Sequence, residues 1–108
     1  MDLIQILTKN KATSKEKLGG GFIGRIKISY PELLDILGKP HFEGSGDNKV
    51  DAEWAYLLDR DTKTVATIYN YKTDGPVACE TNWHIGGHGD RELIKSWIMS
   101  VFKRPMER

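Results

Sequence analysis

Hydrophobic and polar side chains alternate most regularly over residues 50–58. One face of an extended segment there would carry Val50, Ala52, Trp54, Tyr56 and Leu58, and the other Asp51, Glu53, Ala55 and Leu57. A period of two is typical of a β-strand that buries one face. A turn over 59–63 and a second strand over 64–72, rich in β-branched and aromatic residues, follow. The pattern therefore predicts a β-hairpin.

The pairing register of this hairpin has two solutions. If Tyr69 and Tyr71 share the face of Trp54, both tyrosines belong to the core. If Ala66 and Ile68 share that face instead, both tyrosines lie on the opposite face, because a slip of one residue reverses every side chain. The sequence alone leaves both registers open.

A first helix is predicted directly after a strand over 22–28. Ser29 and Glu32 form a capping box, in which each side chain can accept a hydrogen bond from the other residue's backbone N–H. Pro31 lies in the first turn, where no N–H is needed, and Gly38 ends the helix.

A second helix is predicted over 91–102, with Asp90 as its N-cap. Its apolar stripe, at helical spacing, consists of Leu93, Ile94, Trp97, Ile98 and Val101. A strand is expected over 77–85, ended by the glycines of 86–89, and residues 41–49 are expected to form a loop.

This order of elements predicts an α+β fold, with an antiparallel sheet of about four strands and helices packed on one face (β-α-β-β-β-α). The chain has 108 residues, which is the length of one domain. We expect this domain over residues 22–104. Residues 1–21, which are rich in lysine and end in glycines, are expected to be a partly mobile N-terminal segment.

The charge balance limits the classes of partner. The 16 basic and 15 acidic residues give no bulk attraction for duplex nucleic acid or an anionic membrane, so any anion site must be local. The single cysteine, Cys79, excludes an internal disulfide and fits a reducing compartment. No apolar stretch is long enough to cross a bilayer. We therefore expect a cytoplasmic protein with no membrane partner.

The segment 82–91 is the strongest candidate for a binding site. Its candidate ligand-binding residues are Trp83, His84, Gly86, Gly87, His88 and Arg91. Backbone N–H groups before a helix, together with the helix dipole, can hold a phosphate or carboxylate, and an indole can stack on a base. If Tyr69 and Tyr71 face outward, these tyrosines and Lys72 extend the surface.

A purely structural interpretation competes with this one. The glycines could serve a tight turn and a close backbone approach, and the Asp90 carboxylate could occupy the N–H groups of the helix itself. The ligand hypothesis requires an exposed Trp83 and an open backbone.

No catalytic residue, metal site or cofactor is predicted. His84 lies before the glycines, so it cannot pair with His88 at helical spacing, and the chain has no Cys-x-x-Cys or Gly-x-Ser-x-Gly motif. Cys79 in a strand is typically a small core residue. A small hydrolase that uses His84 or His88 as acid and base is kept as an alternative.

Three motifs resemble a family of small bacteriophage and prophage proteins. They are VDAEW at 50–54, TVATIYNYK at 64–72 and NWHIGG at 82–87. The resemblance covers roughly residues 22–101 and carries over no catalytic residue. It implies a viral accessory protein made in the host bacterial cytoplasm. Such proteins often counter host defence, by binding a defence protein or by sequestering a signalling nucleotide.

The sequence therefore favours a non-enzymatic binding module against host defence, with a small nucleotide-type anion as its ligand. Arg91 or Lys72 would neutralise the phosphate and Trp83 would stack on the base. Exposed sheet edges could allow a homodimer or a higher oligomer. The main alternative is a protein–protein inhibitor of a host defence effector, such as a nuclease or a CRISPR effector.

Overall fold

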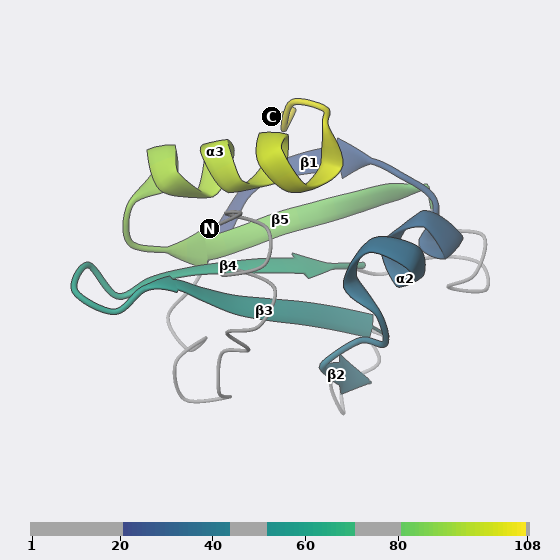
Figure 1. Ribbon diagram of the computed structural model, residues 1–108, viewed down its shortest axis with the longest axis horizontal. Coiled ribbons are helices and arrows are strands. Elements are labelled where there is room, and N and C mark those ends of the chain that lie inside the picture. The colour runs from purple at the N-terminus through teal and green to yellow at the C-terminus, as the bar shows by residue number, and fades with distance from the viewer. Residues whose placement is uncertain (1–20, 44–51, 71–80, 108) are drawn as a thin grey trace.

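A five-stranded antiparallel sheet is the centre of the computed structural model, which describes residues 21–43, 52–70 and 81–107. The strand order is β1-β5-β4-β3-β2 (Figure 1). The elements are β1 (Gly21–Lys27), α2 (Tyr30–Leu37), β2 (Phe42–Glu43), β3 (Ala52–Asp59), β4 (Thr64–Tyr69), β5 (Asn82–His88) and α3 (Arg91–Phe102). The predicted α+β fold is thereby confirmed.

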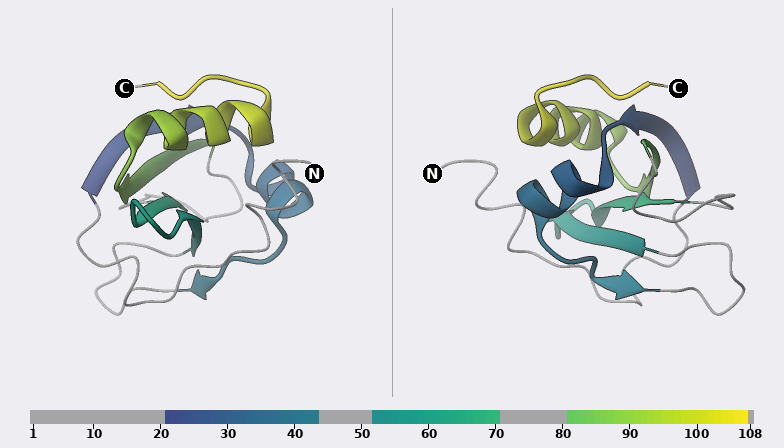
Figure 2. Two further views of the ribbon diagram at one scale, coloured as in Figure 1. Left: turned by 60° about the vertical axis from the view of Figure 1, so that its left-hand side comes forward. Right: turned by 90° about the vertical axis from the view of Figure 1, so that its right-hand side faces the viewer.

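Both helices lie on the same side of the sheet (Figure 2). Each begins where its cap predicts: the Ser29 side chain accepts from the N–H of Glu32, and the Asp90 carboxylate accepts from two N–H groups of α3. Five residues of α3 are buried, whereas α2 buries only Leu33. Within the described residues, neither helix has the length and apolar composition needed to span a bilayer.

The hairpin of β3 and β4 adopts the second of the two registers. Trp54 lies opposite Ile68 and Tyr56 opposite Ala66, so these side chains face the helices. Tyr69 lies opposite Glu53 on the other face of the sheet. Tyr71 and Lys72 lie outside the described residues, as do residues 1–20.

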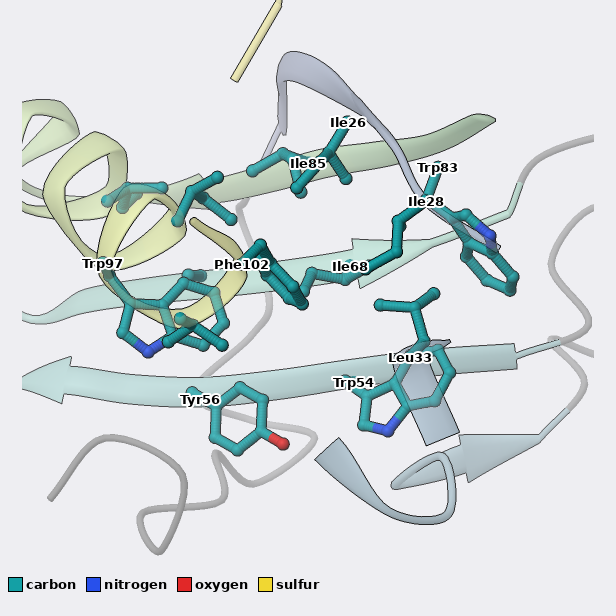
Figure 3. Packing of buried hydrophobic residues seen from close by; sticks show 14 of the residues in the cluster. Ile26, Ile28, Leu33, Trp54, Tyr56, Ile68, Trp83, Ile85, Trp97 and Phe102 are labelled. Carbon is teal, nitrogen blue, oxygen red and sulfur yellow. The ribbon is translucent and has the colours of Figure 1, made fainter. Parts of the chain in front are cut away.

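The core is built around aromatic rings on the helix-covered face (Figure 3). Trp83 is fully buried; its ring stacks on Tyr30 at 5.7 Å between centroids and meets Trp54 edge-on at 5.6 Å. Trp54 Nε1 donates to the carbonyl of Gly38 at 3.1 Å, which ties the end of α2 to β3. These contacts hold α2 against the sheet through two strands that are far apart in sequence.

Among the differences from the expected boundaries, two concern the glycine segment and the expected loop. The strand expected to stop at Ile85 continues through Gly86 and Gly87 to His88, because β1 and β4 pair with it on both sides. Part of the expected loop, Phe42–Glu43, pairs with β3 as a two-residue edge strand. Both differences arise from neighbours that local composition does not reveal.

We predict that Trp83→Ala lowers the free energy of unfolding by about 3–5 kcal/mol, since it removes a fully buried indole from an aromatic cluster. Urea denaturation followed by far-UV circular dichroism measures the change. Met99→Ala is the control, because Met99 is 48% exposed on α3 and should change stability by less than about 0.5 kcal/mol. Equal urea midpoints for the two variants would contradict this packing.

Candidate functional site

Gly86 and Gly87, which precede α3, belong to strand β5 and do not form an open anion-binding loop. β5 is a central strand, with Gly86 paired to Phe22 and Thr67, and Gly87 paired to Gly21 and Ala66. The backbone groups of a central strand point at its two neighbours. Gly86 and Gly87 therefore do not present a row of N–H groups to a ligand.

Gly87 and Gly89 lie where neighbouring parts of the chain leave no space for a side chain. A Cβ at Gly87, where φ is 141°, would lie 2.0 Å from the carbonyl oxygen of Val65. At Gly89, where φ is 96°, it would lie 2.5 Å from Thr64 Oγ1. Side chains do not fit at either position.

The N-terminus of α3 is occupied by its own cap. Asp90 Oδ1 accepts from the N–H groups of Glu92 at 3.0 Å and Leu93 at 3.3 Å, and the N–H of Asp90 itself donates to Thr64 Oγ1 at 2.8 Å. Trp83 lies inside the core, so the predicted stacking of its indole on a ligand is wrong. The predicted use of the Gly86 and Gly87 N–H groups is also wrong, because the sheet pairs these residues on both sides.

The register instead aligns four polar side chains across the opposite face of the sheet. Arg25 of β1 pairs with His84 of β5, His84 with Tyr69 of β4, and Tyr69 with Glu53 of β3. Adjacent strands are about 4.8 Å apart, so the row spans about 14 Å. A cation stands at one end of this row and a carboxylate at the other.

A shallow depression of about 290 Å³ lies at the cationic end of the row. Its lining residues are Phe22, Arg25, Tyr69 and His84. Phe22 and Tyr69 both meet the His84 ring edge-on, at 5.3 and 5.4 Å between centroids, and Arg25 Cζ lies 5.3 Å from the centre of the Phe22 ring. The depression thus combines three rings with a guanidinium group.

Two local features of the backbone create this depression. The pairing of β1 with β5 shifts between Phe22 and Gly24, and this bulge brings Phe22 onto the same face as Arg25. Gly86 lies beneath the rings: a Cβ there would come within 3.0 Å of Tyr69 Cε1. Gly86 therefore contributes to the site by leaving space beneath the rings, and not by donating its N–H to a ligand.

The structure places the predicted site residues in different parts of the molecule. His84 and Tyr69 line the depression, and Gly86 lies under it. His88 is four residues further along β5, about 13 Å from His84 at the usual rise per residue, so the two imidazoles cannot act on one reacting atom. Arg91 is exposed on α3.

Phe22 and Arg25 line the depression, and the sequence did not reveal them as site residues. A strict period of two places Phe22 and Arg25 on opposite faces, so only the bulge unites them. The apolar and basic alternation of residues 22–28 was the available signal, but it does not say which strand lies beside β1.

The depression is lined by aromatic, imidazole and guanidinium side chains. Among the residues that the structure describes, no group of three histidine, cysteine or acidic side chains is placed to hold a metal ion. Burial raises the pKa of the Tyr56 phenol above its ordinary value, so this hydroxyl stays protonated near neutral pH, and Tyr56 faces the helices. The depression offers ring surfaces, an imidazole and a guanidinium group.

We predict that Gly87→Ala lowers the free energy of unfolding by about 2 kcal/mol or more, because the new Cβ clashes with the Val65 carbonyl at a positive φ. Gly21→Ala is the matched control: it lies opposite Gly87, and its Cβ would meet nothing within 4 Å. Thermal and urea unfolding measure both variants. A Gly87→Ala chain as stable as the Gly21→Ala chain would show that the glycine is not needed for packing.

None of the family models, curated proteins or solved structures that were compared with the chain matches it.

Proposed function

We propose that this chain is a non-enzymatic binding module that takes a planar, negatively charged ligand of nucleotide type on the sheet face opposite the helices. One observation carries the proposal: Phe22, Arg25, Tyr69 and His84 line a single depression. A nucleotide combines a flat base with an anionic phosphate, which matches rings next to a guanidinium group.

The energies involved allow useful affinity. Stacking of a base on an aromatic side chain contributes about 1–3 kcal/mol, and a guanidinium group can bind phosphate through two parallel hydrogen bonds. A dissociation constant of 1 μM corresponds to about 8 kcal/mol. Two ring contacts with charge-assisted phosphate contacts approach this value, so we expect micromolar affinity for a single nucleotide.

The layered architecture supports this use of the sheet. The helices and the large aromatic side chains form the core on one face, so β1, β5 and β4 can present rings on the other. Sheet faces of this kind stack unpaired bases in single-stranded RNA-binding domains. The same geometry would accept the base of a mononucleotide or a cyclic nucleotide.

We further propose that binding serves to sequester a signalling nucleotide of host defence, in the cytoplasm of a bacterium infected by a phage. Sequestration needs only a tight site and no reacting group, which fits a depression built from rings and a cation. The resemblance to phage proteins supports the biological setting, and the depression supports the ligand class.

We predict that a member of a panel of linear and cyclic mono- and dinucleotides raises the melting temperature of the chain. At a ligand concentration of 100 times the dissociation constant, the stabilisation is about 2.7 kcal/mol, or on the order of 10 °C for a domain of this size. Differential scanning fluorimetry screens the panel, and isothermal titration calorimetry then measures the affinity.

For the ligand that this panel identifies, Phe22→Ala is expected to weaken binding between about 5-fold and 150-fold, which corresponds to the loss of one ring contact. Met99→Ala is the matched control, since Phe22 is 49% and Met99 48% exposed, and Met99 lies on α3. Arg25→Gln should weaken binding and reduce its dependence on salt. The proposal fails if no nucleotide stabilises the chain, or if Met99→Ala weakens binding as much as Phe22→Ala does.

A further inference from the structure

The outer edge of β1 is one end of the sheet, and the chain's own C-terminal residues partly cover it. Arg25 and Glu107 form an antiparallel bridge in which each backbone N–H donates to the other's carbonyl (Figure 2 shows the C-terminal segment returning from α3). An uncovered edge strand exposes N–H and C=O groups that can pair with another chain. This bridge satisfies the groups of β1 at Arg25.

The segment that follows α3 also contacts the end of β1 and helix α2. Arg104 Nη1 donates to the carbonyl of Lys27 at 2.6 Å, and Arg104 Nη2 bonds Glu32 Oε2 at 3.1 Å. Met106 is partly buried against the core. The segment thus combines backbone pairing, one ion pair and one apolar anchor.

Gly24 provides the space for this docking. A Cβ at this position would lie 2.5 Å from the carbonyl oxygen of Glu107 and 2.9 Å from Met106 Cγ. The backbone of a second strand can therefore approach β1 closely only because Gly24 has no side chain. The outer edge of β1 therefore has space for a strand in which an apolar residue is followed by an acidic one.

The docked segment, as far as the structure describes it, pairs with only part of the outer edge of β1. Within the described residues, it forms a β-bridge with β1 at Arg25 alone, although β1 extends from Gly21 to Lys27. The earlier part of the strand carries Phe22, which is 49% exposed. A longer strand along this edge would continue the pairing past Arg25 toward Phe22.

We infer that the outer edge of β1 is a strand-addition site for an extended segment of a partner protein that carries an apolar residue followed by an acidic residue opposite Arg25, and that the chain's own residues 105–107 hold its place. In such complexes the backbone ladder supplies affinity and alternate side chains supply specificity. The charges on β1 select the partner: Arg25 and Lys27 are exposed and basic, and the bridge already places Glu107 opposite Arg25. Pairing of β1 with β1 of a second copy would bring these basic residues together, which is unfavourable.

The test uses the chain with Glu107→Pro, because proline has no N–H to donate to Arg25 and so removes one of the two bonds of the bridge without altering β1. Glu107→Gln is the control that keeps the backbone bridge. The probe is a synthetic peptide of residues 102–108, added to each ¹⁵N-labelled variant while the amide signals of β1 are followed by NMR. We expect shifts at Ile23, Arg25 and Lys27, and at least tenfold tighter binding by Glu107→Pro than by Glu107→Gln.

Two further variants sharpen the result. Adding Gly24→Ala to Glu107→Pro should abolish peptide binding, whereas adding Gly21→Ala should not. Only Gly24→Ala places a Cβ in the space that the docked strand occupies. A peptide with lysine in place of the glutamate should bind at least fivefold more weakly. Equal binding by Glu107→Pro and Glu107→Gln, or shifts confined to other elements, would overturn the inference.

A measurement on the unmodified chain covers the case in which Glu107→Pro does not fold. If the segment is exchangeable, the Arg25 amide should exchange with deuterium at least tenfold faster than the Ile85 amide of the central strand, because release of the segment does not require global unfolding. Equal protection of the two amides would mean that the segment is a permanent strand, and the inference would fail.

Discussion

The pairing of β4 with both of its neighbours is the constraint on which the rest of the structure depends. Ile68 lies opposite Trp54 on one side and opposite Ile85 on the other, so one register decides the inner face of three strands. A shift of one residue would place Tyr69 opposite Trp54 and so exchange Ile68 for Tyr69 in the core. The aromatic cluster under α2 and α3 and the polar row on the other face both follow from this choice.

The central position of β5 decides what its glycines do. A glycine-rich segment before a helix is equally typical of an anion site and of close strand packing, and local composition does not separate the two. Here β1 and β4 approach from both sides, and Thr64 receives the N–H of Asp90, so packing uses this backbone. The proposed ligand site therefore consists of side chains on the face opposite the helices, among which His84 and Tyr69 remain from the sequence hypothesis.

The irregular part of β1 connects the two proposed surfaces. The shift in pairing between Phe22 and Gly24 brings Phe22 to the face that carries Arg25, and the same stretch gives Gly24 its contact with Glu107. Arg25 therefore contributes its side chain to the depression and its backbone to the bridge with the C-terminal segment. A strand that replaced this segment would lie next to the depression, which places a ligand and a protein partner within reach of one residue.

Local signals in the sequence were sufficient for the helices and for most of the sheet. The caps at Ser29 and Asp90 and the alternation around Trp54 depend on residues close in sequence, so they predicted α2, α3 and β3. Strand order, the bulge in β1 and the burial of Trp83 depend on contacts between distant segments, which periodicity does not encode. The sequence by itself therefore determined both helices, most of the strands and the α+β class. Only the tertiary structure decided which side chains share the face opposite the helices, because that depends on which strands become neighbours.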